Sequence, residues 1–215
     1  MNPELIELVA ACIVKGLTDN PDLEIKPGVP VGISNRHIHL SAQAAAVLFG
    51  DGYNLTKVKA LTQIGEFSAA ETVTLVGPKG VIQGVRVLGP LRNFSQVEIS
   101  RTDSFTLGIK PPIRDSGNIA GSAGLTVVGP VGALTLKEGV IIAARHIHMS
   151  EAEAGVFGLC DGNRVSVFTV GPRSEVLNNV LVRVGPKYRL EFHIDTDEAN
   201  AAELNNGDLV GVVSG

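Results

Sequence analysis

One block of eleven residues occurs twice in this chain, and it constrains the fold more than any other feature. Residues 31–41 read VGISNRHIHLS and residues 140–150 read VIIAARHIHMS, so that His37 and His146 are 109 positions apart. An internal repeat is the mark of a duplicated structural unit. We therefore expect two similar halves.

The sequence around the two blocks repeats as well. Each block runs into a helix-like segment, 41–49 or 150–159, and then into an Asp-Gly turn pair. Ser150 and Glu153 have the spacing of a capping box. Farther on, Gly89-Pro90 leads to QVEIS (96–100), and Gly185-Pro186 leads to EFHID (191–195).

Between these landmarks the pattern is that of β-strands. Runs rich in β-branched residues occupy 71–76, 81–87, 165–170 and 180–184, and Gly-Pro pairs separate them at short intervals. Short strands with frequent turns favour small barrels over an alternating α/β sheet. The prediction is a mainly β protein with two similar small β-barrels and short capping helices. Residues 106–139 have no copy in the second half, and we interpret them as the connection.

Composition excludes several classes of function. The net charge of −4 gives no general field that would attract nucleic acid or an anionic membrane. Tryptophan is absent and aromatic residues make up 4%, which argues against a base-stacking surface. No apolar run is long enough to span a bilayer. We expect a soluble, intracellular protein.

The first twenty residues form a unit of their own. Asn2-Pro3-Glu4 is a good helix start, and apolar residues then follow at helical spacing through Leu17. Residues 18–22 break the pattern and are typical of a linker. An amphipathic helix on a linker is either a docking peptide for a partner or an arm that packs on its own barrel.

All five histidines fall in the repeated blocks. Residues i and i+2 of a strand point to the same face about 6.6 Å apart, so each His-Ile-His can present two imidazoles to one metal ion. A single such pair is often a chance surface feature. Its occurrence twice in the same context favours a metal site in each half.

Alignment of the halves suggests a third ligand for each site, because Glu98 falls opposite His193 between apolar neighbours. The predicted ligand sets are His37, His39 and Glu98, and His146, His148 and His193. Three protein ligands with one open position are typical of catalytic zinc. Imidazole and carboxylate also suit cobalt or nickel.

Four arginines, Arg36, Arg92, Arg101 and Arg145, lie near these blocks in the sequence. Beside a metal pair, arginine suits an anion such as phosphate, although Arg101 and Arg145 are equally explained as rim charges. The chain has no phosphate-binding P-loop, dinucleotide fingerprint or nucleophile elbow. The residues alone therefore predict a two-metal enzyme that acts on an anionic substrate.

Several longer blocks resemble the PduL-type phosphotransacylases, also called phosphate propanoyltransferases. The resemblance covers about residues 29–213 and shows no departure at a motif position. Its blocks are residues 31–41, 71–80, 88–92, 96–103, 145–150 and 191–200. It implies reversible conversion of an acyl-CoA, propanoyl-CoA above all, and phosphate to an acyl phosphate and CoA on two zinc ions.

The resemblance also implies roles for individual residues. It places one zinc on His37, His39 and Glu98 and the other on His146, His148 and His193. Arg92 matches the phosphate-binding arginine of the family. The positions that line the CoA site in such enzymes are Ser34, Lys59, Arg86, Leu88, His193 and Asn200.

Members of this family consist of paired barrels in which the strand before the first His-x-His is exchanged into the C-terminal barrel. We accordingly expect a helix and linker at 1–20, one barrel domain at 36–143, and a second at 25–35 plus 144–215. Members form homo-oligomers, and many work in propanediol degradation inside bacterial microcompartments, guided by an N-terminal amphipathic peptide. Residues 2–17 fit that description, so the expected location is the bacterial cytoplasm, inside a microcompartment.

Two other classes of function use the same features. A dinuclear zinc thioester hydrolase would have the same ligands with water as the nucleophile. A non-catalytic assembly module would use the zinc sites and the N-terminal helix for docking alone.

Overall fold

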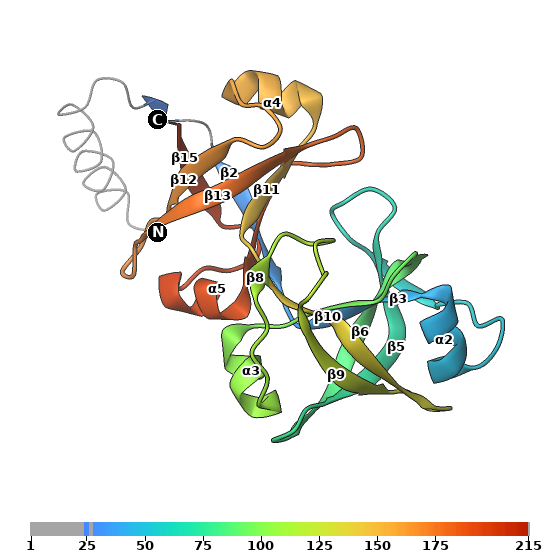
Figure 1. Cartoon of the computed structure of the whole chain (residues 1–215). Helices are drawn as coiled ribbons and strands as arrows, with labels where there is room; N and C mark the ends of the chain where they lie inside the picture. Colours follow the sequence, from blue (N-terminus) through green and yellow to red (C-terminus); the bar gives the residue numbers. More distant parts are fainter. Residues whose placement is uncertain (1–23, 26–27, 215) are drawn as a thin grey trace.

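The computed structural model describes residues 24–25 and 28–214, so the predicted N-terminal helix and linker lie outside the described residues. The described chain is mainly β and forms two closed six-stranded barrels with four short helices, as predicted. In Figure 1 the first barrel, coloured cyan to yellow, lies beside the second, which is coloured orange to red.

The ring of the first barrel closes because β9 pairs with both β10 and β5. In order around the ring its strands are β5 (Phe67–Val76), β6 (Val81–Arg92), β3 (His37–Ser41), β7 (Gln96–Glu98), β10 (Ala133–Ala143) and β9 (Ala123–Val128). Two short strands, β4 (Lys57–Ala60) and β8 (Ile113–Arg114), extend the sheet along β5 and β10.

The second barrel closes in the same way, because β15 pairs with both β12 and β2. Its ring is β12 (Arg164–Phe168), β13 (Val176–Val184), β11 (His146–Met149), β14 (Glu191–Asp195), β2 (Val29–Ser34) and β15 (Leu209–Ser214). The two-residue strand β1 (Glu24–Ile25) pairs with β15.

The two barrels exchange strands reciprocally. The chain passes through β2 in the second barrel and then directly into β3 of the first, and β2 is visible in blue beside the orange strands (Figure 1). It later passes through β10 in the first barrel and directly into β11 of the second. Each His-Ile-His strand is therefore preceded by a strand of the opposite barrel.

This exchange corrects the interpretation of residues 106–139 as a connection. The segment contributes β8, β9 and the start of β10 to the first barrel, and β9 is the strand that closes it. Its counterpart in the second barrel is β15, which follows β14 (191–195) more closely in the sequence than β9 follows β7 (96–98), so the repeat spacing does not show the match.

The helices follow the repeat and begin where strands end. They are α2 (Ala42–Phe49), α3 (Arg101–Leu107), α4 (Glu151–Phe157) and α5 (Thr196–Ala202). Ser150 and Glu153 form the predicted capping box of α4, and α3 and α5 have capping boxes of the same kind. These caps fix the direction in which the chain leaves β7, β11 and β14.

Each barrel has its own hydrophobic core. Ile38 in the first and Ile147 in the second, the residues between the paired histidines, are fully buried. Because side chains alternate along a strand, burying each isoleucine in its barrel turns the flanking histidines outward to the opposite face. None of the described helices has the length and apolar character needed to cross a bilayer.

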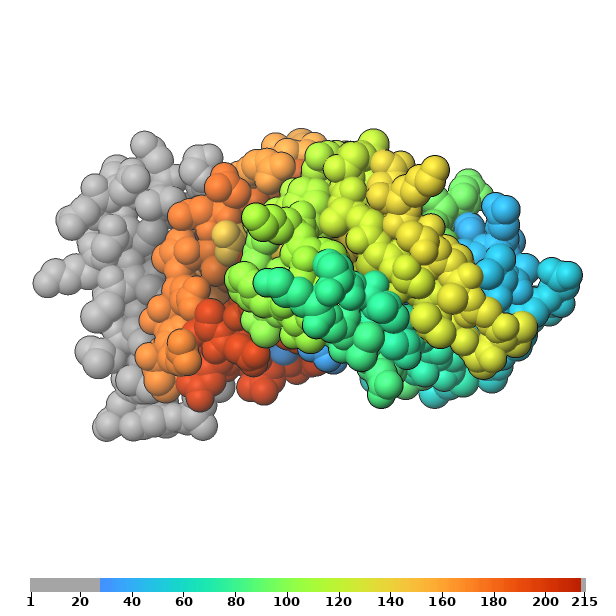
Figure 2. Space-filling model, turned by 60° about the horizontal axis from the view of Figure 1, so that its bottom comes forward, coloured from blue at the N-terminus to red at the C-terminus, as the bar shows by residue number. Residues whose placement is uncertain are grey.

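The barrels contact each other between helices α3 and α5 and through the β4–β5 loop. The backbone N–H of Thr102 in α3 donates to Asp197 Oδ2 in α5 at 2.8 Å, and the red and green surfaces meet in Figure 2. On the other side, the β4–β5 loop crosses to the second barrel, where Ile64 N–H donates to the Lys187 carbonyl at 3.2 Å.

Candidate metal centre and substrate cleft

The repeated histidines gather into two clusters, one on each barrel. His37, His39 and Glu98 bring their potential ligand atoms within 4.8 Å of one another, and so do His146, His148 and His193. The register explains this, since His37 pairs with Glu98 and His146 with His193 across neighbouring antiparallel strands. Both predicted ligand sets are therefore spatial groups.

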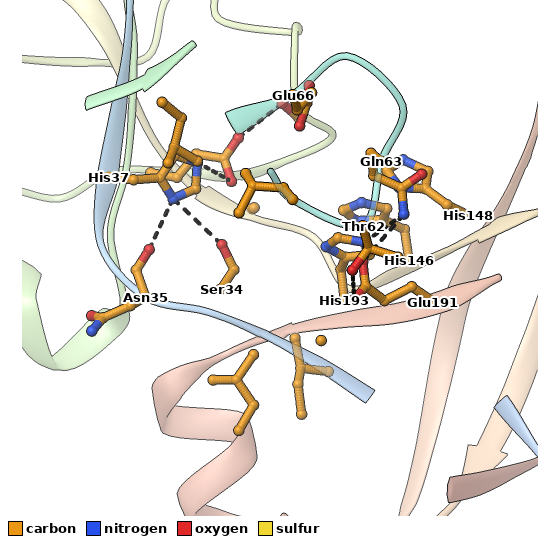
Figure 3. Close-up of a pocket in the computed structure, with 18 of the residues that line it drawn as sticks. Ser34, Asn35, His37, Thr62, Gln63, Glu66, His146, His148, Glu191 and His193 are labelled. Atoms are coloured by element: carbon orange, nitrogen blue, oxygen red, sulfur yellow. Dashed lines mark hydrogen bonds and ion pairs between the residues drawn. The ribbon is translucent and has the colours of Figure 1, made fainter. Parts of the chain in front are cut away.

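Both clusters line one cleft of about 1050 Å³ between the barrels. In Figure 3, His37 lies on one side of the cleft, and His146, His148 and His193 gather on the other. His146 also acts electrostatically on the carboxylate of Glu98, which shows that the clusters are near each other.

Equivalent backbone carbonyls orient the first histidine of each pair. His37 Nδ1 lies 2.8 Å from the carbonyl oxygen of Asn35, and His146 Nδ1 lies 2.8 Å from that of Ala144. In each ring an Nδ1–H that donates to the carbonyl leaves Nε2 with a free lone pair for a metal.

The second histidines have buried nitrogens without hydrogen-bond partners. These atoms are Nδ1 of His39 and both ring nitrogens of His148. Buried polar atoms are nearly always paired, so unpaired ones at the centre of a ligand cluster fit a metal ion. Two imidazoles with a carboxylate, and three imidazoles, are both donor sets that zinc accepts.

Burial also keeps these imidazoles neutral, which is the state that binds metal. It lowers the pKa of His148 to about 2, with the charge of His146 adding to the effect. Burial and His37 together lower the pKa of His39 well below its ordinary value. Burial alone would raise the pKa of Glu98, but His37 and His39 outweigh it, so the pKa is lowered and the carboxylate is ionised.

In each cluster the third predicted ligand contacts one side chain that the predicted sets do not include, Gln96 in the first and Glu191 in the second. Gln96 Nε2 donates to Glu98 Oε1 at 2.6 Å in the first barrel. In the second, Glu191 Oε2 lies 2.9 Å from His193 Nε2. Gln96 and Glu191 occupy the same position two residues before the third ligand, so the alignment of the halves contained the signal needed to find them.

Further contacts could not be predicted from the sequence. Ser116 Oγ donates to Glu98 Oε1 at 2.8 Å, and the ring of Tyr188 stacks on His148 with centroids 4.1 Å apart. Thr62 and Gln63 of the β4–β5 loop both donate to Glu191. Burial by itself would raise the pKa of Glu191, but hydrogen bonds from His193, Thr62 and Gln63 lower it.

Arg92 lines the cleft, where its Nη2 lies 3.0 Å from Glu66 Oε1. Arg36 and Arg145 are instead engaged structurally. They pair with Asp103 and Glu198, the capping-box acids of α3 and α5, at 2.8 Å and 3.2 Å. Neither Arg101, exposed at the start of α3, nor Arg145 is among the residues that line the cleft. Arg36 also lines the cleft, but its guanidinium is paired with Asp103. Arg92 is the predicted arginine that both lines the cleft and acts electrostatically on a cluster histidine, His39.

Of the six positions matched to a CoA site, five line the cleft and one does not. Ser34, Lys59, Arg86, Leu88 and His193 line the cleft, and Ser34 Oγ lies 3.4 Å from His37 Nδ1. Arg86 uses one nitrogen to donate to the carbonyls of Ala69 and Ala70. Asn200 is exposed on α5 and is not among the lining residues.

Two closed barrels that present paired metal-ligand clusters to one polar cleft define a double-barrel protein with a duplicated candidate metal centre. Comparison with known proteins gives the family. Residues 30–205 match the family model described as phosphate propanoyltransferase. The chain belongs to this family, which supports a phosphotransacylase activity and an acyltransferase enzyme.

Curated relatives agree over nearly the whole chain. A phosphate propanoyltransferase of Thermotoga maritima is 55% identical, over 89% of this chain and 91% of its own. One of Rhodobacter capsulatus is 53% identical over 97% and 94%, and one of Salmonella typhimurium is 49% identical over 96% and 95%.

Proposed function

We propose that the chain transfers an acyl group, propanoyl above all, between CoA and inorganic phosphate in the cleft between the barrels. The observation that supports this is that both ligand clusters and Arg92 line the same cleft. In the forward reaction a phosphate oxygen attacks the thioester carbonyl carbon, the C–S bond breaks, and CoA leaves as its thiolate. Phosphate is already an anion at neutral pH, so no protein nucleophile is needed.

The proposed cofactors are two Zn²⁺ per chain, one on each cluster. When bound, zinc supplies Lewis-acid polarisation and stabilises negative charge on the reacting groups. The chain itself contributes neutral, buried imidazoles and a fixed carboxylate, which are ready to bind metal without losing protons.

We assign phosphate binding to Arg92. Its guanidinium can bind two phosphate oxygens at once, and Glu66 holds it at the cleft when phosphate is absent. Phosphate competes with Glu66 for the same guanidinium, so binding exchanges one anion for another rather than creating a new buried charge. Positioning of this kind accounts for a large share of the barrier reduction in such a transfer.

The CoA moiety is proposed to lie along Ser34, Lys59, Arg86, Leu88 and His193, with Asn200 reached only by the part of the molecule that extends outside the cleft. We further propose that the barrels are the domains, at 36–143 and at 25–35 plus 144–215, with 1–20 as a separate segment. Homo-oligomers, residence in a bacterial microcompartment and docking through residues 2–17 are also proposals, based on the family.

The function is tested by release of free thiol from a panel of acyl-CoA esters, with and without phosphate. We expect phosphate-dependent release that is fastest with propanoyl-CoA, loss on full metal removal, and at least a 100-fold loss in Arg92→Ala. Arg173→Ala is the matched control, because Arg173 is exposed in a turn of the second barrel outside the cleft lining. Equal thiol release without phosphate would show the hydrolase instead, and metal binding without turnover would show an assembly module.

A further inference from the structure

Glu191 is a half-buried carboxylate in the cleft with no counterpart of the same charge in the first barrel. It stands in register with His148, just as Gln96 stands in register with His39. The two halves therefore have different side chains at two equivalent positions, which are 96 and 98 in β7 and 191 and 193 in β14. The first has an amide followed by a carboxylate ligand, and the second has a carboxylate followed by an imidazole ligand.

Both oxygens of Glu191 are engaged. Oε2 lies 2.9 Å from His193 Nε2 and accepts from Gln63 Nε2 at 3.2 Å, while Oε1 accepts from Thr62 Oγ1 at 2.8 Å. Gln63 is itself fixed to the second barrel, because its side chain donates to the Arg189 carbonyl and accepts from the Arg189 N–H. The carboxylate is thus held in place from two barrels (Figure 3).

The exchanged strand β2 makes room for this carboxylate. A Cβ atom on Gly32 would lie 2.7 Å from Cδ of Glu191, which is too close for both to stay where they are. The register places Gly32 opposite His193, and the matching residue opposite Glu98 is Ile141, which is fully buried. Glycine therefore occurs in the half that has the carboxylate, and a large side chain in the half that has the amide.

The exchange of Gln96 and Glu98 in the first barrel for Glu191 and His193 in the second affects the charge at each cluster. A divalent ion with His37, His39 and Glu98 carries a net charge of +1, while one bound by three neutral imidazoles keeps +2. The carboxylate of Glu191, hydrogen-bonded to a ligand, brings the second centre back to +1. Carboxylates that bind a ligating histidine also fix its ring, and their loss typically weakens metal binding by about 10- to 100-fold.

We propose that Glu191 is the positioning residue of the second metal cluster, where it orients His193 and supplies the negative charge that Glu98 supplies in the first. Thr62 and Gln63 hold it from the opposite barrel, and Gly32 provides the space that it occupies. The inference rests on the proposed metal-binding function of that cluster.

The test measures metal affinity with one cluster silenced at a time. Among the described residues, His39→Ala leaves the second cluster as the intact three-ligand group, and His148→Ala leaves the first. Zinc affinity is measured by competition with a chelator, and Co²⁺ loaded in place of zinc reports the ligand field by its visible absorption. Glu138→Gln is the matched control, since Glu138 is an exposed strand carboxylate that accepts the Gly121 N–H and is not among the residues that line the cleft.

We expect Glu191→Gln to weaken zinc binding about 10- to 100-fold and to shift the Co²⁺ spectrum in the His39→Ala background. In the His148→Ala background it should change affinity less than 3-fold. Gly32→Ala in the His39→Ala background should reproduce the loss, because the new Cβ displaces only the end of a flexible side chain. Gly32→Ala keeps the Glu191 carboxylate, so it tests the effect of moving that carboxylate, whereas Glu191→Gln tests the effect of removing its charge.

The outcomes distinguish the inference from the function on which it rests. If folded His39→Ala takes up no zinc, the second cluster is not a metal site, and both proposals fail there. If His39→Ala binds zinc and Glu191→Gln binds it equally well with an unchanged spectrum, only the role of Glu191 is overturned. Equal weakening in both backgrounds would also overturn it, since that pattern marks a general structural effect.

Discussion

The two ligand clusters have the same backbone and different chemistry. In each, a His-Ile-His strand pairs with a short antiparallel strand that carries the third ligand, and a carbonyl two residues earlier orients the first ring. The ligand atoms are two nitrogens and a carboxylate in one cluster and three nitrogens in the other. Duplication has thus preserved the positions of the ligands while their charge has diverged.

The clusters differ also in what supports them. The third ligand of the first is held by Gln96 and Ser116, which both belong to the same barrel. The third ligand of the second contacts Glu191, which depends on Thr62 and Gln63 of the opposite barrel. The third ligand position of the first cluster is therefore supported from its own barrel, whereas that of the second is fully supported only when the barrels are in contact.

Activity should fall most when one proposed ligand is removed at a time. His39→Ala and His148→Ala should each reduce phosphate-dependent thiol release by about 10³-fold or more, because the proposed transfer needs both centres. Steady-state assays with saturating phosphate measure this. A variant with one cluster removed that keeps a tenth of wild-type activity would show that its cluster is not part of the reaction.

The next effect concerns stability. Ile38→Ala and Ile147→Ala each remove a fully buried side chain, so each should lower the free energy of unfolding by about 2–5 kcal/mol. Because β2 and β10 are exchanged between the barrels, we expect either change to move one common unfolding transition. Calorimetry that shows two transitions, with each variant moving only one, would contradict cooperative barrels.

Acid should destabilise the metal-free protein. The pKa values of His39, His146 and His148 are lowered in the folded chain by burial, so below about pH 6.5 the unfolded chain binds protons that the folded chain does not. Stability is therefore lost as the pH falls from 7 toward 5, by up to about 1.4 kcal/mol per pH unit for each histidine. Denaturant unfolding at several pH values measures the slope.

The clusters should share this slope unequally, since two of the three histidines belong to the second barrel. His148→Gln should flatten the dependence of stability on pH. Glu98→Gln should leave that dependence unchanged between pH 5 and 7, because the lowered pKa of Glu98 means that its carboxylate takes up a proton only at more acid pH. If Glu98→Gln changed the slope of stability against pH and His148→Gln did not, the buried histidines would not be the source of the acid destabilisation.

The smallest effect separates the two capping ion pairs. Arg36 contacts Asp103 through two nitrogens, at 2.9 Å and 2.8 Å, whereas Arg145 contacts Glu198 through one at 3.2 Å. We expect Arg36→Ala to cost about 1 kcal/mol of stability and Arg145→Ala less, since partly exposed pairs are screened by solvent. Thermal unfolding of the two variants side by side gives the order, and an equal or reversed order would contradict it.

Much of this arrangement could be predicted from the sequence, because the relevant signals are local. Two His-Ile-His blocks, each with an apolar residue between the histidines, are enough to place ligand pairs on strands and the isoleucines in the cores. The alignment of Glu98 with His193 indicated the third member of each spatial group. The barrels themselves follow from short strands and turns at regular intervals.

The remainder depends on contacts between distant segments. The closure of the first barrel by β9 is hidden, because β9 and its counterpart β15 follow the preceding repeated strands at different spacings in the sequence. The ion pairs of Arg36 and Arg145 with capping acids require knowledge of where α3 and α5 begin. Thr62 and Gln63 belong to a loop without a repeated motif, so only the fold shows that they reach Glu191.

The number of zinc ions bound per chain in the wild type, His39→Ala and His148→Ala decides whether the metal centre is duplicated. Native mass spectrometry of folded protein after zinc loading and removal of excess metal gives these counts. Two independent clusters predict two ions in the wild type and one in each variant. A wild type that holds a single ion, or a variant that keeps both, would contradict a duplicated metal centre.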